Sequence, residues 1–102
     1  DRIFSQGYGD GYEVGSIVVD GSGHLTLDGQ VRVSGAWAYL LDATGDSVYV
    51  VVGGSAIARY DFSGTPTLTD LVETMGGPVN MRFGAETAYA PLGYAGVARI
   101  PF

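Results

Sequence analysis

The sequence contains no cysteine, no lysine and only one histidine in its 102 residues. Without cysteine there is no disulfide framework, no thiolate zinc site and no cysteine nucleophile. Basic residues are scarce, because five arginines stand against eleven acidic residues and leave a formal charge of −6. Nucleic-acid phosphate and anionic lipid both require clustered positive charge, so we expect neither as a partner.

Long apolar runs are also missing, since no stretch approaches the roughly 18 residues that a membrane-spanning helix needs. The sequence has no initiator Met and no signal peptide, so we expect it to begin in the middle of a larger protein. Glycine is abundant, with 17 residues, and the apolar fraction is 46%. This composition favours one small domain of many short strands and tight turns.

An internal repeat gives the strongest structural signal. Residues 56–62 match residues 96–102 at an offset of 40, with Ala, Arg and Phe coinciding. Residues 46–49 match residues 86–89 at the same offset, and residues 1–4 form a third copy. A second pair of segments, beginning at His24 and Pro66, repeats at about 42 residues. A unit of four strands in about 40–45 residues is the period of a propeller blade.

The predicted fold is therefore all-β, an antiparallel β-propeller segment of about two and a half four-stranded blades within a larger ring. With strands a to d named outward, the chain runs b, c, d, then a, b, c, d, then a, b, c. We expect a partial blade over residues 1–35, a full blade over 36–77 and a partial blade over 78–102. Strand b of the full blade, Val48–Val52, is apolar on both faces, as expected of a strand between two neighbouring blades.

One segment, Thr65–Met75, has helical signals. Its apolar residues recur at helical spacing: Leu68, Leu71, Val72 and Met75. Proline near its start and glycine after its end are helix punctuation. Its repeat partner, however, contains Gly29 and an alternating Val-Arg-Val run, which favour a strand. We therefore predict a strand here too.

Residues 86–97 (ETAYAPLGYAGV) resemble the LVIVD-repeat and related secreted bacterial β-propellers, whose blades carry an AYV…G…AGL run followed by two apolar residues and an acid. The resemblance extends loosely over nearly the whole chain and is most specific from Ala88 to Val97. The sequence departs from the pattern at Pro101, which stands where the pattern has an acidic residue. Asp20 and Asp61 retain the acidic residue in their own copies of the repeat. The resemblance implies a propeller fold, a secreted or periplasmic location and a role as a binding scaffold.

The glycine-rich run Gly7–Tyr12 is the one candidate binding segment. A phosphate-cradling loop needs a helix after it, and here a strand follows, with Asp10 and Glu13 repelling phosphate. We interpret the run as a long b–c loop with Tyr8, Asp10 and Tyr12 as possible binding residues.

Arg59 and Arg99 occupy the same repeat position. We interpret each as a structural ion pair with a carboxylate of the neighbouring blade, its stem packed on apolar surface. The functional alternative is a ring of guanidinium groups that faces an anionic ligand.

Catalytic and metal sites find little support. His24 lies four residues from Asp20 and from Asp28, a set that a hairpin could gather around a divalent cation. We interpret it as a turn histidine between two surface aspartates. Ser22 near His24 lacks the third group that would orient a base. We therefore predict no catalytic residue, no metal and no cofactor.

The repeat-matched aromatic residues Phe4, Tyr49 and Tyr89 are predicted to be buried at equivalent core positions. The predicted function is a non-catalytic scaffold or protein-interaction module. Because the expected strand order lacks an inner strand in the first blade and an outer strand in the last, another polypeptide segment must complete the ring. That segment is the remainder of the same propeller or another protein chain. The alternative is a propeller face that binds a ligand, most simply a carbohydrate.

Overall fold

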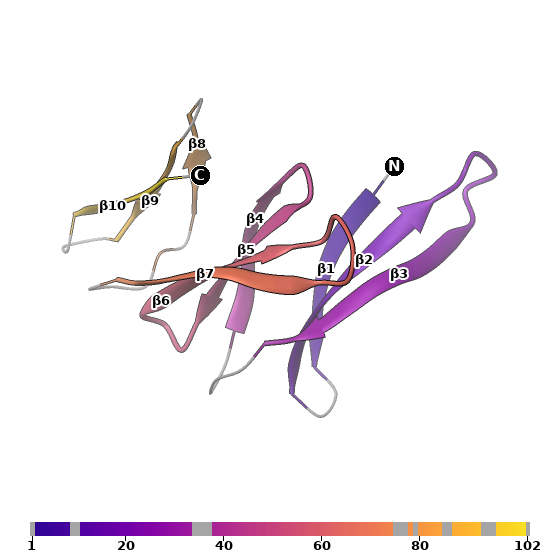
Figure 1. Cartoon of the computed structure of the whole chain (residues 1–102), viewed down its shortest axis with the longest axis horizontal. Coiled ribbons are helices and arrows are strands. Elements are labelled where there is room, and N and C mark those ends of the chain that lie inside the picture. The colour runs from indigo at the N-terminus through magenta and orange to yellow at the C-terminus, as the bar shows by residue number, and fades with distance from the viewer. Residues whose placement is uncertain are drawn as a thin grey trace.

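The computed structural model describes residues 2–8, 11–33, 38–74, 78, 80–84, 87–92 and 96–101. Within these residues the chain is all-β, with ten strands and no helix (Figure 1). The strands are β1 (Arg2–Tyr8), β2 (Tyr12–Val19), β3 (Leu25–Arg32), β4 (Ala38–Thr44), β5 (Ser47–Val52), β6 (Ala56–Asp61), β7 (Thr67–Glu73), β8 (Arg82–Phe83), β9 (Thr87–Pro91) and β10 (Val97–Pro101).

The strands form three antiparallel sheets, in each of which neighbours along the chain pair with one another. The first sheet is β1-β2-β3, the middle sheet β4-β5-β6-β7 and the last sheet β8-β9-β10. Figure 1 shows the three sheets following one another across the molecule in chain order. The predicted grouping of ten strands into three, four and three is thus confirmed for the part of the chain that the structure describes.

Strand β7 occupies the segment with helical signals, so the strand prediction is confirmed there. It pairs with β6 from Ala56 opposite Glu73 to Asp61 opposite Thr67. Leu68 and Leu71 on β7 are 48% and 59% exposed, so their helical spacing does not mark a buried stripe. The ladder with β6 satisfies the backbone of this segment, and tertiary pairing overrides a local pattern of this length.

The tight turns fall where glycine and acidic residues cluster. Gly45 and Asp46 connect β4 to β5 as a two-residue loop between the paired Thr44 and Ser47. Gly45 has a φ of +59°, in the left-handed region that such a hairpin turn requires. The Phe62 N–H donates to the carbonyl of Asp46 at 2.8 Å, which ties this turn to the end of β6.

Equivalent rows of paired residues recur in the three sheets. In antiparallel sheets, residues directly opposite one another point to the same face. The rows are Phe4–Ser16–Gly29 in the first sheet, Tyr49–Arg59–Asp70 in the middle sheet and Tyr89–Arg99 in the last sheet. The second and third of these rows lie 40 residues apart, the offset of the sequence repeat.

The adjoining rows point to the opposite face of each sheet and also match. They are Ile3–Ile17–Leu27 in the first sheet, Val48–Tyr60–Leu68 in the middle sheet and Ala88–Ile100 in the last sheet. In the first and middle sheets a register shift lies between the two rows, between Ser16 and Ile17 and between Arg59 and Tyr60. The repeat therefore extends to a β-bulge at the same place in two sheets.

Two buried clusters hold the sheets together. The first lies between the first and middle sheets and comprises Val14, Val33, Ala38, Val48, Val50, Ala58, Tyr60 and Phe62. The second lies between the middle and last sheets and comprises Tyr49, Ile57, Met81, Ala88, Ala90 and Ile100. Strand β5 contributes one face to each cluster. Of the predicted strand Val48–Val52, Val48 to Val51 are fully buried and Val52 is half-buried.

The prediction that Tyr49 and Tyr89 are both buried is wrong for Tyr89. Tyr49 is 0% exposed, whereas Tyr89 is 44% exposed. Phe4 is half-buried and packs edge-on against Phe62, with ring centroids 5.3 Å apart. The difference arises because the last sheet covers the Tyr49 row, while within the described residues no sheet covers the equivalent row of Tyr89.

The run Gly7–Tyr12 is not the long loop that the sequence predicts. Gly7 and Tyr8 belong to β1 and Tyr12 begins β2, and the ladder between these strands continues to Tyr8 opposite Tyr12. Pairing satisfies backbone groups that a long loop would leave to water. The two strands therefore extend beyond their counterparts β5 and β6, which have six residues each.

Candidate binding surface

A pair of tyrosines closes the β1–β2 hairpin. The rings of Tyr8 and Tyr12 meet edge to face, with centroids 4.9 Å apart and an interplanar angle of 69°. Tyr8 is 73% exposed, whereas Tyr12 packs partly against the cluster between the first and middle sheets. The structure thus brings together two of the three predicted binding residues, and Asp10 lies outside the described residues.

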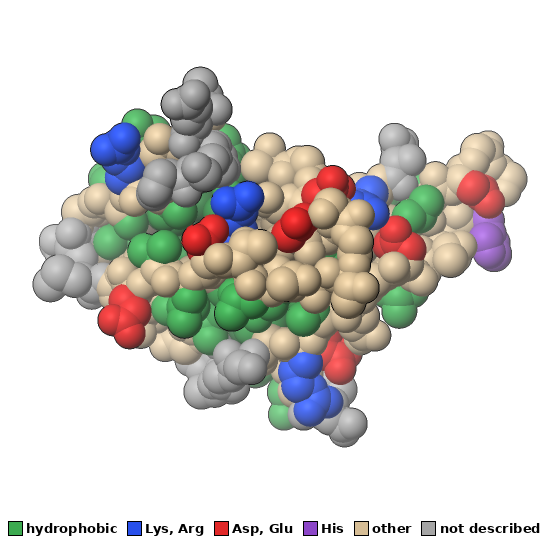
Figure 2. Space-filling model, in the orientation of Figure 1, with side chains coloured by type: hydrophobic (Ala, Val, Ile, Leu, Met, Phe, Trp, Pro, Cys, Tyr) green, Lys and Arg blue, Asp and Glu red, His purple; other side chains and the backbone are tan. Residues whose placement is uncertain are grey.

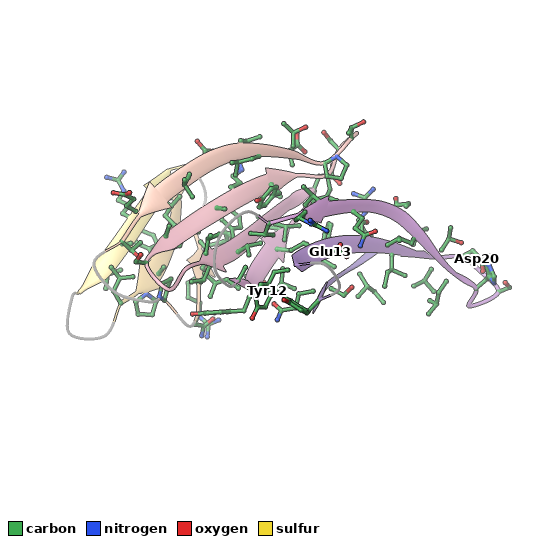
Figure 3. The ribbon with its side chains drawn as sticks, turned by 90° about the horizontal axis from the view of Figure 1, so that it is seen from below. Tyr12, Glu13 and Asp20 are labelled. Atoms are coloured by element: carbon green, nitrogen blue, oxygen red, sulfur yellow. The ribbon has the colours of Figure 1, made fainter. Side chains whose placement is uncertain are left out.

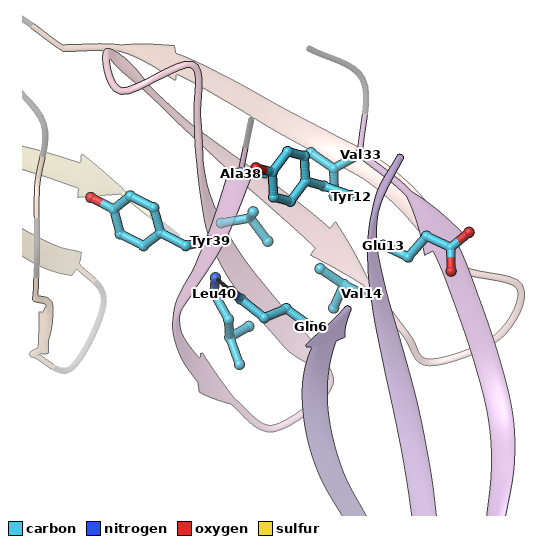
Figure 4. A pocket seen from close by; sticks show the side chains of 9 residues that line it. Gln6, Tyr12, Glu13, Val14, Val33, Ala38, Tyr39 and Leu40 are labelled. Atoms are coloured by element: carbon cyan, nitrogen blue, oxygen red, sulfur yellow. Dashed lines mark hydrogen bonds between the residues drawn. The ribbon is translucent and has the colours of Figure 1, made fainter. Parts of the chain in front are cut away.

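A shallow hollow of about 150 Å³ lies beside Tyr12, between the first and middle sheets (Figure 4). Its lining comes from β1, β2, β4 and β5 and from Val33 after β3, and it includes Gln6, Tyr12, Val14 and Leu40. The Leu40 N–H donates to the Gln6 side-chain carbonyl and links β4 to β1 across the hollow. Hardly any of this space would admit even a water molecule, so the hollow is too small to enclose a small-molecule ligand.

Three of the polar side chains that line the hollow, Gln6, Glu13 and Tyr39, have hydrogen-bond partners. The Gln30 amide donates to the Glu13 carboxylate, and the Tyr39 hydroxyl donates to the carbonyl of Pro78. Burial raises the pKa of Tyr39, which keeps this phenol protonated and able to donate. Among the described residues at this place, the ring of Tyr8 is the most exposed aromatic surface.

The two predicted structural arginines stand in the same register but have different surroundings. Arg59 pairs with Asp70 of the adjoining strand β7 at 3.3 Å, and its Nε donates to the Ser47 hydroxyl at 3.3 Å. This carboxylate belongs to the same sheet, not to a neighbouring one. Arg99 lies opposite Tyr89, and within the described ranges no carboxylate pairs with it.

Arg2 forms an ion pair between neighbouring sheets, the kind of contact predicted for Arg59 and Arg99. Its guanidinium contacts Asp46 of the middle sheet at 2.6 Å and Asp28 of its own sheet at 3.2 Å. It also donates to the carbonyl of Phe62 at 3.3 Å and lies 5.8 Å from the centre of the Phe4 ring. Arg2 therefore connects the first sheet to the β4–β5 turn and to the end of β6. The repeat does not signal this role, because Arg2 occupies a spacer position where the other two copies have Ser47 and Thr87.

His24 lies at the tip of the β2–β3 hairpin, where Asp20 organises the turn. The Asp20 carboxylate accepts from the Ser22 hydroxyl at 2.7 Å and from the N–H groups of Ser22 and His24 at 2.9 Å. The Ser22 hydroxyl, followed by these N–H groups, lowers the pKa of Asp20. Asp28 contacts Arg2 instead. Among the described residues, no group of three His, Asp or Glu side chains is placed to hold a metal ion.

The outward faces of the first and last sheets expose apolar side chains. We define the first end face as Ile3, Ile17, Val19, Leu25 and Leu27, and the last end face as Tyr89, Val97 and Arg99. Ile3 is 51% exposed, Leu25 and Leu27 are each 59% exposed, and Val97 is 64% exposed. The β2–β3 hairpin carries most of the first end face and reaches beyond the other sheets, with Asp20 near its tip (Figure 3).

Charges are dispersed on the face seen in Figure 2, where acidic and basic side chains are interspersed and apolar side chains reach the surface over the last sheet. No helix long and apolar enough to cross a membrane occurs in the described ranges.

No family model matches the chain, and neither a curated protein nor a solved structure matches it.

Proposed function

We propose that this chain is a non-catalytic scaffold or protein-interaction module of the β-propeller type. The three sheets are successive blades, partial over residues 1–35, complete over 36–77 and partial over 78–102. Another polypeptide segment, either the remainder of the same propeller or a different chain, completes the ring. Membership of the secreted LVIVD-repeat type, with a secreted or periplasmic location, is part of this proposal and depends on residues 88–97.

One observation carries the proposal: equivalent faces are buried inside the chain and exposed at its two ends. Tyr49 and Ile57 are 0% and 1% exposed beneath the last sheet, whereas their counterparts Tyr89 and Val97 are 44% and 64% exposed. At the other end, Val48 is 0% exposed beneath the first sheet, whereas its counterpart Ile3 is 51% exposed. Each end thus presents the kind of face that the interior of this chain covers with another sheet.

The number of sheets supports an incomplete ring. A propeller closes with four or more blades, and three sheets are described in this chain. Contiguous exposed apolar faces on a soluble protein mark interaction sites. An additional sheet packed on each end face would bury them as the two internal interfaces do.

The test is the molar mass of the purified chain, measured by sedimentation equilibrium over a range of concentrations. We expect species heavier than the 10.6 kDa chain, because the end faces associate when no companion covers them. The variants Leu27→Lys and Val97→Lys should reduce this association. Leu71→Lys is the matched control, since Leu71 is 59% exposed like Leu27 but lies on the middle sheet, which is packed on both sides. A stably folded monomer of 10.6 kDa, with no companion, would overturn the proposal.

A second candidate is carbohydrate binding at the Tyr8–Tyr12 pair. It is supported by the exposure of the Tyr8 ring, which offers an apolar face beside a polar hydroxyl. Because the neighbouring hollow is small, a sugar would lie on this surface and not within a cavity. Binding to immobilised oligosaccharides that is lost in Tyr8→Ala and kept in Tyr89→Ala would support this function. The absence of any such binding by the unmodified chain would exclude it.

A further inference from the structure

The outer edge of β10 is equivalent to an edge that is occupied in the middle sheet. β9 and β10 pair in the register of β5 and β6, since Tyr89 lies opposite Arg99 as Tyr49 lies opposite Arg59. In the middle sheet, β7 pairs with the far side of β6. In the last sheet, whose order is β10-β9-β8, the described part of the chain supplies no strand on the far side of β10.

Strand β7 shows what such a strand contributes. Its Asp70 lies opposite Arg59 and pairs with it at 3.3 Å. The Thr69 hydroxyl donates to the carbonyl of Arg59 at 3.1 Å, which fixes the strand at the bulge. Leu68 and Val72 lie opposite Tyr60 and Ile57 and extend the two apolar faces of the sheet. A carboxylate flanked by apolar residues is therefore the chemistry that this edge accepts.

Arg99 occupies the position of Arg59 without a strand beside it. No ion pair or hydrogen bond joins its guanidinium to another described residue, and it shares a face with the exposed Tyr89 and Val97. An unpaired edge presents N–H and C=O groups that readily accept another strand. Pro101 has no N–H to offer, so the usable edge runs over residues 97–100.

We propose that the free edge of β10 binds an extended polypeptide segment as an added antiparallel strand, and that this segment carries a carboxylate opposite Arg99. The proposal rests on the proposed function, because it names the chemistry of the segment that completes the last sheet. Main-chain hydrogen bonds provide the affinity, and the carboxylate opposite Arg99 sets the register.

The probe is a capped synthetic peptide with the sequence of residues 67–73, the chain's own example of such a strand. We expect it to bind the full chain in a calorimetric titration and to slow amide hydrogen exchange in residues 97–100. Replacing its aspartate with asparagine should weaken binding by a factor between about 1.4 and 5, the range for a partly exposed ion pair. Arg99→Gln should weaken the original peptide by a similar factor and abolish the difference between the two peptides.

Arg82→Gln is the matched control, because Arg82 also lies opposite Tyr89 but on β8, at the other edge of the sheet. It should leave both affinities unchanged. Failure of the peptide to protect residues 97–100, or equal binding of the aspartate and asparagine peptides, would overturn the proposal. Concentration-dependent protection of β10 that persists in the Val97→Lys variant alone would overturn it too, because a second copy would then occupy the edge and not the end face. These outcomes are independent of the sedimentation result. A monomeric chain that binds the peptide would contradict the proposed incomplete ring and would still support the binding site at the edge of β10.

Discussion

Tyr49 and Tyr89 lie in the same register of successive sheets, each directly opposite an arginine, yet Tyr49 is fully buried and Tyr89 is 44% exposed. Phe83 of the last sheet packs on Tyr49, with ring centroids 5.3 Å apart. The same residue in the same register therefore differs in burial because a further sheet lies over Tyr49 and none of the described sheets lies over Tyr89. The energetic contributions of the two rings should differ accordingly.

We expect Tyr49→Ala to lower the free energy of unfolding by about 3–5 kcal/mol, the range for emptying a buried aromatic site. Tyr89→Ala should change it by less than about 1 kcal/mol, as substitutions at partly exposed sites do. Urea unfolding followed by circular dichroism measures both. If Tyr49→Ala is too unstable to purify, Tyr49→Phe keeps the ring and should lose about 1 kcal/mol or less. Equal losses for the two alanine variants would contradict the assigned packing.

Arg2 and Asp46 should show energetic coupling across the interface between the first and middle sheets. Their side chains are 30% and 54% exposed, so the pair is partly screened by water. A double-mutant cycle of Arg2→Gln and Asp46→Asn should give a coupling of about 0.5–1 kcal/mol, decreasing as salt is added. The control cycle of Arg2→Gln with Asp70→Asn should give none, because Asp70 pairs with Arg59 instead. Coupling of equal size in both cycles would argue against the contact.

Alkaline pH should destabilise the fold through its buried tyrosines. Burial raises the pKa of Tyr49 and of Tyr60 above the ordinary value of 10.0. Because the folded state favours the neutral phenol, its stabilising contribution is complete below about pH 10 and is lost as the pH rises through the folded-state pKa. Tyrosinate absorbance near 295 nm should therefore increase together with unfolding. Tyr49→Phe should move this transition to higher pH, and an unchanged midpoint would show that Tyr49 does not contribute.

Gly29 should resist replacement because the middle sheet approaches it closely. A Cβ there would lie 3.3 Å from Pro66 Cγ and 3.5 Å from the Phe62 ring, and both neighbours are rigid. Gly7, on strand β1, has open space at its Cβ position. Gly7→Ala should stabilise the chain by up to about 1 kcal/mol, because alanine loses less backbone entropy on folding. Gly29→Ala should lose that gain, because the added methyl group crowds Pro66 and Phe62. Thermal unfolding of the two variants measures the difference. Equal stabilisation by both would show that the sheets are not in close contact here.

The sequence by itself determined the strands, their grouping and the repeat. Val48–Val52 is apolar at every position except Tyr49, which is itself repeat-matched, and a strand of that kind must be covered on both faces wherever it lies. The repeat partner of Thr67–Glu73 was sufficient to choose a strand over its helical spacing. These properties are local or depend on comparing one stretch of chain with another, so they can be read without coordinates.

Only the tertiary structure decided burial and pairing. Tyr89 is exposed because no described sheet covers its row, which its own sequence context cannot indicate. Arg2 meets Asp28 and Asp46 across 26 and 44 residues of chain, and no local spacing relates them. Tyr8 and Tyr12 became strand residues and an edge-to-face pair because the β1–β2 ladder includes Gly7 and continues to Tyr8 opposite Tyr12, where glycine otherwise signals a loop. In each case the deciding energy comes from a neighbour that folding brings close, and the linear order of residues does not specify that neighbour.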